Sequence, residues 1–374
     1  MLDGENEFDG LKNVIKTEAS ENLLSFKEDV LQKTYCSLAS MAWTSWKYWS
    51  EGDADDYVQS MIVAKSLIEN NGFNHRELVK KYRTRPGYVL KGKELWFAGI
   101  DPRHKGQVAK LLKSNDPLYI SKNGVSDGAA MKVIPIAAFF HDNLDQTIKF
   151  TDKITQITHN TVEARLAAVL VALRFQQILI EKNPTAERLL NMLDHSISLM
   201  DIKQESRFFR DLTETAAMIT EKENDPEKLL IQLATHIGIE HLAWSTPVSA
   251  CFWSYRADNN FNKWFQMEGK KKIHVNAVSI SPQTLKKQVR KSYTRHLKQI
   301  HHYADFMRGH WYHWKRSIDI DTFFSISFSL IAAKEGINPI LNEVHEAVMT
   351  FGDDLEKMAA KLCLKTGNIN KKSY

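Results

Sequence analysis

Glycine, proline and cysteine are all scarce in this sequence. Its 374 residues include 16 Gly and 9 Pro, both below the average shares of about 7% and 5%, so chain breakers are few and a helical fold is favoured. The three cysteines, Cys36, Cys251 and Cys363, are far apart and odd in number, which argues against a disulfide framework and against a zinc site of the CxxC type. This usage fits a reducing cytosol.

Long apolar runs are also lacking. No run reaches the roughly 18 residues that a membrane span needs, and the acidic start MLDGENEFDG differs from the basic and then apolar start of a secretory signal. The 43% hydrophobic and 25% charged content is typical of a soluble globular protein. We therefore expect a cytoplasmic protein, or an effector delivered into another cell without an ordinary signal peptide.

The apolar residues recur at helical spacing over most of the chain, and no alternating pattern is long enough to build a sheet. We expect an all-α fold with a first helix from about residue 31, followed by helices over residues 57–70, 161–183, 186–200, 205–221, 227–244, 282–307, 322–336 and 342–351. Residues 86–117 are expected to form a loop with little regular structure. One domain over residues 26–365 is expected between a flexible polar arm (1–25) and a polar tail (366–374).

Positive charge is concentrated in one stretch, residues 270–316. It holds twelve Lys or Arg against one acid, Asp305, so its own charge is +11. The whole chain has a net charge of +5, and the rest of the sequence therefore carries −6. We interpret residues 269–315 as a basic insertion. One interpretation is a solvated helix face. The alternatives are a surface that docks an acidic protein partner, a contact with the adenylate part of a ligand, or a site for nucleic acid or phospholipid. Trp311, Tyr312 and Trp314 either stack on an adenine or fill a core.

Three polar motifs stand at the starts of expected helices: GDADDY (52–57), VSDGAAM (125–131) and SIDIDTFF (317–324). Aspartate at a helix start is commonly explained by capping alone. Asp55 and Asp56, with Asp319 and Asp321 followed by Thr322, nevertheless make a set of hard oxygen ligands suited to magnesium, calcium or manganese. In the middle motif, small residues let backbone N–H groups approach an anion, and a following helix would offer its positive end.

The order of four motifs resembles that of the ADP-ribosylglycohydrolase family. ADDY (54–57) is similar to its early TDDT motif, SDGAAMKVIP (126–135) to its GAAMR turn, ITHNTVEA (157–164) to its I-T-H motif, and SIDIDT (317–322) to its late GGDTDT motif. The resemblance implies a compact, orthogonal all-α bundle. It also implies an enzyme that removes ADP-ribose from a modified protein side chain, most familiarly arginine, by hydrolysing the N-glycosidic bond at ribose C1″.

The same resemblance implies the site residues. Catalytic carboxylates would be Asp55, Asp56, Asp319 and Asp321, with Glu51 as a candidate for a missing family glutamate. The metal ligands would be Asp55, Asp56, Asp319, Asp321 and Thr322. ADP-ribose would be bound by Asn123, Gly124, Val125, Ser126, Asp127, Gly128, Met131 and His159. Taken alone, His159 is better explained as a buried, hydrogen-bonded histidine.

The sequence departs from the family pattern at three supports of this site. Ala54 and Tyr57 stand where the family has threonines, and Ile318 replaces a glycine. One Mg²⁺, two, or none therefore stay open. Two other functions also stay open: a catalytically degenerate member that binds ADP-ribose or a modified protein, and a basic helical protein that binds nucleic acid.

Overall fold

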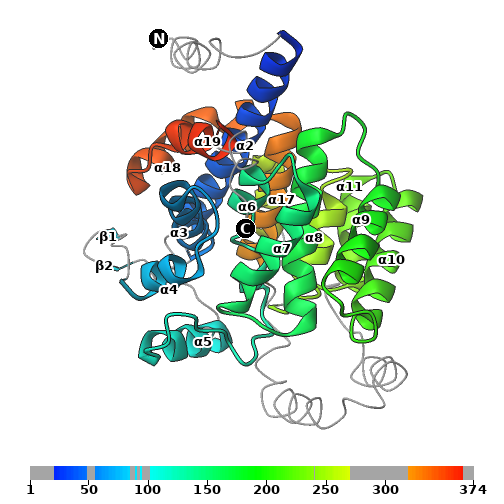
Figure 1. The fold of residues 1–374 in the computed structure, drawn as a ribbon. Helices are drawn as coiled ribbons and strands as arrows, with labels where there is room; N and C mark the ends of the chain where they lie inside the picture. Colours follow the sequence, from blue (N-terminus) through cyan, green and yellow to red (C-terminus); the bar gives the residue numbers. More distant parts are fainter. Residues whose placement is uncertain are drawn as a thin grey trace.

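The computed structural model describes residues 21–48, 55–84, 89–90, 93–94, 102–239, 241–269 and 319–364. Helices make up most of this part of the chain (Figure 1), which confirms the all-α prediction. The strands described are β1 (Val89–Leu90) and β2 (Lys93–Glu94), an antiparallel pair in which Val89 lies opposite Glu94. The helices are α2 (Glu21–Tyr48), α3 (Asp55–Asn70), α4 (His75–Thr84), α5 (Pro102–Lys113), η3 (Asp127–Ala129), α6 (Ile134–Phe139), α7 (Leu144–Gln156), α8 (Val162–Ile180), α9 (Ala186–Leu199), α10 (Arg207–Lys222), α11 (Pro226–His236), α12 (Thr246–Trp253), α13 (Phe261–Gly269), α17 (Ile320–Glu335), η4 (Asn338–Ile340), α18 (Leu341–Phe351) and α19 (Leu355–Leu364).

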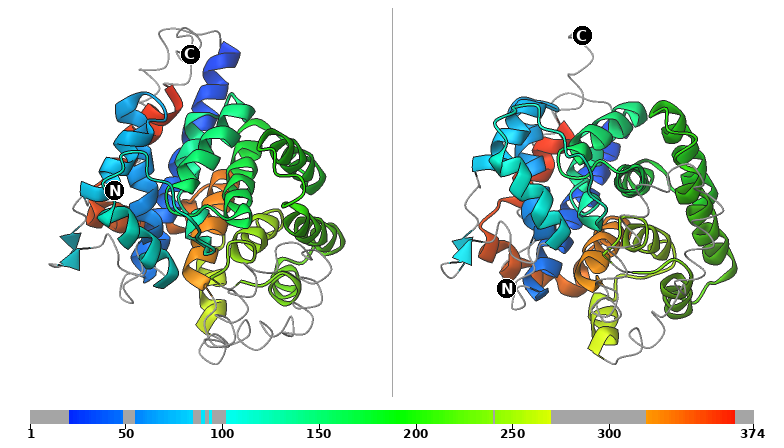
Figure 2. Two further views of the ribbon diagram at one scale, coloured as in Figure 1. Left: turned by 60° about the horizontal axis from the view of Figure 1, so that its bottom comes forward. Right: turned by 90° about the horizontal axis from the view of Figure 1, so that it is seen from below.

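Helices α2, α8 and α17 form the centre of the molecule. α17 packs along α2, and α12 contacts both α17 and α8. α8 is apolar on nearly every side and is buried over most of its length, as expected for a helix enclosed by others. In Figures 1 and 2, α9 and α10 lie on one side of this centre, whereas α3, α18 and α19 lie on the other. Asp55, the first residue of α3, and Asp319, the N-cap of α17, are both buried.

Most expected helices within the described residues are confirmed, with ends that shift by a few residues, except that the first helix begins at Glu21, ten residues before its expected start. Two expectations are wrong. Residues 102–113 of the expected loop form α5, because Pro102 suits the first helical position and Val108 and Leu111 are buried. The helix expected over 227–244 ends at His236, where Gly238 N donates to Leu233 O (3.0 Å) and closes it.

Several expectations lie outside the described residues. They concern Glu51, the basic stretch 270–316 with its aromatic residues, the polar tail, and the first twenty residues of the arm; α2 begins at Glu21, five residues before the expected domain boundary. In the part of the chain that is described, no helix is both long and apolar enough to span a bilayer.

Candidate functional site

The early and late acidic motifs meet in space. Asp55 and Asp56 form the first turn of α3, and Asp319 caps the start of α17. Thr322 Oγ1 donates to Asp56 Oδ1 (3.4 Å) across a separation of 266 residues. All three aspartates are at most 6% exposed. Two helix starts that are remote in sequence thus present their carboxylates to one buried region.

Asp319 uses its two carboxylate oxygens differently. Oδ1 accepts the Thr322 backbone N–H (3.2 Å), which is an ordinary helix cap. Oδ2 forms an ion pair with His241 Nδ1. The backbone N–H of Asp319 donates to Ile239 O (2.9 Å), so α17 begins against the segment that carries His241. The capping interpretation and a site role are therefore compatible for the same residue.

The environment of Asp319 favours its ionised form. Burial acts to raise the pKa of this carboxyl group, but the charge of His241 and hydrogen bonds with His241, Asp127 and Asp321 hold the pKa well below its usual range. Asp321, in the first turn of α17, is partly buried. Asp319 is therefore a carboxylate at any pH near neutrality.

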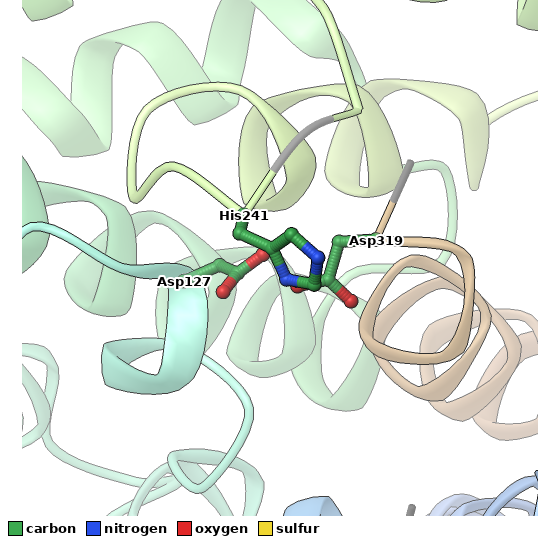
Figure 3. A group of neighbouring side chains, drawn as sticks. All are labelled: Asp127, His241 and Asp319. Carbon is green, nitrogen blue, oxygen red and sulfur yellow. The ribbon is translucent and has the colours of Figure 1, made fainter. Parts of the chain in front are cut away.

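Asp127, His241 and Asp319 converge from three separate segments (Figure 3). One nitrogen or oxygen atom from each side chain lies within 4.8 Å of the others. Asp127 is 2% exposed, whereas the His241 side chain is 25% exposed, so His241 is the most solvent-exposed of the three side chains. Two carboxylates and an imidazole are suitable metal ligands. A divalent ion therefore fits the donors that this structure brings together.

His241 has no signal in the sequence. It lies in the connection between α11 and α12, within the span expected to be helical, and no spacing to another ligand marks it. The hydrogen bond from Ala243 N to Val125 O (2.9 Å) holds this connection against the glycine-bearing turn. This tertiary contact helps to bring His241 close to Asp127.

The turn over residues 123–128 is shaped by a close backbone approach. Gly124 has φ +132°, and a Cβ atom there would lie 2.8 Å from both His159 Cα and Thr158 O. Thr161 Oγ1, at the start of α8, donates to Gly124 O (2.7 Å). Asn123 is exposed and its side-chain oxygen accepts from Gln107 Nε2 (2.7 Å). The turn is therefore held tightly on its inner side.

The prediction that an α-helix follows this turn directly and offers its positive end to an anion is wrong. Asp127, Gly128 and Ala129 form only a three-residue 3-10 helix, and Ser126 makes no side-chain cap bond to it. The next α-helix, α6, begins at Ile134. Anion binding at the turn would thus depend on local N–H groups. Met131 is buried, and its carbonyl accepts from Ser60 Oγ of α3 (2.9 Å).

His159 lies behind this turn. It is 0% exposed, its Nε2 contacts Ser126 Oγ (2.8 Å), and its Nδ1 contacts Thr158 Oγ1 (2.9 Å). This geometry is that of a buried, hydrogen-bonded histidine. A contact between His159 and ADP-ribose stays a prediction.

A buried lysine lies beneath the early acids and was not singled out in the sequence. Lys132 is 0% exposed, and its Nζ donates to Thr158 Oγ1 (2.5 Å) and to Gln59 Oε1 (3.4 Å). Burial lowers its pKa to about 7, opposed by the charge of Asp55. The early acidic motif therefore has a basic group under it.

Comparisons with known proteins bear on the family and the fold. A model of the family described as ADP-ribosylglycohydrolase matches residues 15–370. Among solved structures 43 chains match. One, described as an "ADP-ribosylglycohydrolase-related protein complex", aligns with a TM-score of 0.56 and 14% identity over 91% of this chain and 99% of that chain. At this identity the likeness shows the fold alone. A search among curated proteins found no match.

Proposed function

This chain belongs to the ADP-ribosylglycohydrolase family, and from that premise we propose that it removes ADP-ribose from a modified arginine side chain of a protein. Hydrolysis of ADP-ribose from modified groups is the activity that the family implies. The bond broken would be the one between ribose C1″ and a guanidinium nitrogen. The site residues would be the aspartates that open α3 and α17 and the turn over residues 123–128.

The contact between Thr322 and Asp56 is the observation that supports this proposal most directly. It joins the early and late motifs beside the turn that carries Asp127, whose carboxylate approaches Asp319. A capping role for each aspartate would not require the two helix starts to meet. Their convergence into one buried acidic region is what a glycosidic site needs.

The chemistry follows from the charge of this region. Cleavage of a glycosidic bond passes through an oxocarbenium-like transition state, which nearby carboxylates stabilise. Asp55 and Asp56 would orient or deprotonate the attacking water, and Asp319, ionised near neutrality, would stabilise the developing positive charge. A bound divalent ion would supply polarisation of the ribose hydroxyls and of the water.

Arginine is the proposed acceptor because of the same charge. A guanidinium group presents a planar set of donors that carboxylates accept bidentately. Asp55, Asp56 and Asp319 are at most 6% exposed, so a cation that reaches them would be strongly attracted. A serine acceptor has no positive charge and would gain nothing from these aspartates after cleavage.

Release of ADP-ribose from an ADP-ribosylated arginine peptide tests the proposal. Asp55→Asn and Asp319→Asn should each lower kcat by about 10²-fold or more, with thermal unfolding measured alongside. Asp194→Asn serves as the matched control, since Asp194 pairs with Arg210 on the surface (2.6 Å). Release by both site variants at the rate of the control would refute the assignment. Release from a serine-linked peptide alone would refute arginine as the acceptor.

A binding protein without turnover is the second candidate, and Tyr57 is the observation that favours it. The phenol is buried, donates to Asp353 Oδ2 (2.9 Å) and packs on Phe351, so its hydroxyl is directed to the connection between α18 and α19 rather than to the start of α17. It therefore does not substitute for the hydroxyl of the family's threonine. Calorimetric binding of ADP-ribose with no release from any ADP-ribosylated peptide would establish this alternative.

A further inference from the structure

A line of hydrogen bonds joins a buried lysine to the turn over residues 123–128. Lys132 Nζ donates to Thr158 Oγ1 (2.5 Å), and the same oxygen contacts His159 Nδ1 (2.9 Å). His159 Nε2 in turn contacts Ser126 Oγ (2.8 Å). All four side chains are at most 1% exposed. We call this line the buried relay, and its members depend on one another because a missing partner is costly away from water.

Ser126 does not play the part that its position predicts. It is the N-cap of the 3-10 helix Asp127–Ala129, where a serine oxygen commonly accepts a backbone N–H, yet it forms no such bond. Its hydroxyl meets His159 instead. A Cβ atom on Gly124 would lie 3.1 Å from His159 Cδ2, so the imidazole ring is packed directly against the turn. The contact between Ser126 and His159 is therefore part of how the turn is built.

Lys132 gives the relay a direction. Its Nζ donates both to Thr158 Oγ1 and to Gln59 Oε1 of α3 (3.4 Å), and an amine or an ammonium group has enough N–H groups for both contacts. Thr158 Oγ1 is thus already an acceptor. In the described part of the chain, the other side-chain partner of this hydroxyl is His159 Nδ1. A hydroxyl that accepts a hydrogen bond becomes a stronger donor, so the Thr158 O–H donates to Nδ1.

That direction determines the tautomer of His159. Complete burial disfavours the charged imidazolium, and a neutral imidazole carries one N–H. With Nδ1 as an acceptor, the proton is on Nε2 and is donated to Ser126 Oγ. The hydroxyl hydrogen of Ser126 then remains available to an acceptor at the turn. In the opposite tautomer, Ser126 would use this hydrogen on Nε2.

We propose that Lys132 is a positioning residue which, through Thr158 and His159, holds the Ser126 hydroxyl as a hydrogen-bond donor to an anionic group of the ligand. This inference rests on the proposed function for the identity of that ligand, ADP-ribose, whose pyrophosphate supplies acceptor oxygens. The direction of the buried relay is a property of the protein without ligand. It can therefore be measured separately, and each proposal can fail while the other stands.

The first test is NMR spectroscopy of the full-length protein with ¹⁵N-labelled histidine rings, in which the His159 signals are assigned by their loss in His159→Gln. The wild type should show an unprotonated Nδ1 and a protonated Nε2. Lys132→Met removes the donor at similar size, and Thr158→Val removes the hydroxyl, so each should shift the His159 signals toward the other tautomer. Thr155→Val is the matched control, because buried Thr155 donates only within α7, to Thr151 O (2.7 Å), and it should leave these signals unchanged.

The second test is a double-mutant cycle on ADP-ribose affinity, measured by calorimetry. Lys132→Met should weaken binding at least about twofold, the loss expected when the two tautomers become equally populated. Ser126→Ala should weaken it by about tenfold. If Lys132 acts through Ser126, then Lys132→Met has no further effect on affinity in the Ser126→Ala background. A purely structural role of Lys132 would weaken binding equally in both backgrounds.

Three results would overturn the inference. They are a protonated Nδ1 on His159 in the wild type, unchanged His159 signals in folded Lys132→Met and Thr158→Val proteins, and a loss of affinity from Lys132→Met that persists in full beside Ser126→Ala. Circular dichroism shows which variants fold, and Thr158→Val keeps the size of the side chain should Lys132→Met not fold. Tautomer shifts as expected, in a protein that binds no ADP-ribose, would refute the proposed function and leave the buried relay standing.

Discussion

Replacement of Gly124 by alanine tests how the turn over residues 123–128 is held. At this position the backbone has φ +132°, and a Cβ atom would lie 2.8 Å from His159 Cα and from Thr158 O, and 3.1 Å from His159 Cδ2. The two nearest atoms belong to the backbone just before α8, so they cannot move aside as the end of a flexible side chain could. The added methyl group therefore forces either the turn or the start of α8 to shift.

The expected cost has two parts. A non-glycine residue in a sparsely populated backbone conformation costs about 1–3 kcal/mol, and inserting a methyl group into packed surroundings costs about 1–3 kcal/mol more. Gly124→Ala should thus lower the free energy of unfolding by about 2–6 kcal/mol. The whole free energy of unfolding of a typical domain is about 5–15 kcal/mol. If the turn shifts to relieve the overlap, the loss of stability approaches the lower value and ADP-ribose affinity falls instead.

Two other glycines separate these contributions. Gly72 has φ +141° with nothing within 4 Å of an added Cβ, so Gly72→Ala measures the backbone cost alone. Gly106 lies in α5 in open space, and Gly106→Ala should stabilise the protein by about 0.5–1 kcal/mol. Urea denaturation of the three variants, with calorimetry of ADP-ribose binding, completes the assay. If Gly124→Ala costs no more than Gly72→Ala and binds ADP-ribose as the wild type does, the close approach to His159 does not shape the turn.

Two further predictions concern groups around the same site. Lys132 has a pKa of about 7 in the folded protein and near 10.5 in the unfolded chain. Between these two pH values the unfolded chain binds more protons than the folded protein. The contribution of Lys132 to the free energy of unfolding therefore rises with pH. We expect urea denaturation at pH 7 and pH 9 to show that the free energy of unfolding of the wild type, relative to Lys132→Met, increases by up to about 1.4 kcal/mol per pH unit. The same free-energy difference between the two proteins at both pH values would contradict this. Thr161→Ala removes a helix cap and the bond to Gly124 O, so it should cost about 1 kcal/mol and also weaken ADP-ribose binding. Thr185→Ala removes only the cap of α9, so it should lower stability without weakening ADP-ribose binding. If Thr161→Ala and Thr185→Ala bind ADP-ribose equally well, the hydrogen bond to Gly124 O is unimportant for the turn.

Local patterns were sufficient for most of the helices. α8 is apolar on nearly all sides and begins at a threonine cap, and α3 begins at its paired aspartates, so both could be located from the sequence. α5 is not predicted, because residues 86–117 mix short apolar pieces with turns, although Pro102 stands at the helix start. The end of α11 was misplaced because apolar residues continue past His236 into α12.

The candidate site was predictable where a motif is local and unpredictable where a contact is not. Paired aspartates and a glycine-bearing turn can be recognised from neighbouring letters. His241 and Lys132 carry no such pattern, yet one pairs with Asp319 and the other lies near Asp55. His159 was marked by its motif, but its complete burial follows from the close packing of the turn on residues 158 and 159.

By itself, the sequence determined that this protein is helical, that it carries the motifs of the ADP-ribosylglycohydrolase family, and that its acids stand at helix starts, because periodicity and capping act over a few neighbouring residues. Only the tertiary structure decided which of these acids meet, that a histidine joins them, and that the turn is followed by a short 3-10 helix rather than by an α-helix. Those outcomes depend on how α2, α3, α8 and α17 pack. Packing brings together side chains that are far apart in the sequence, and no local pattern indicates that they are in contact.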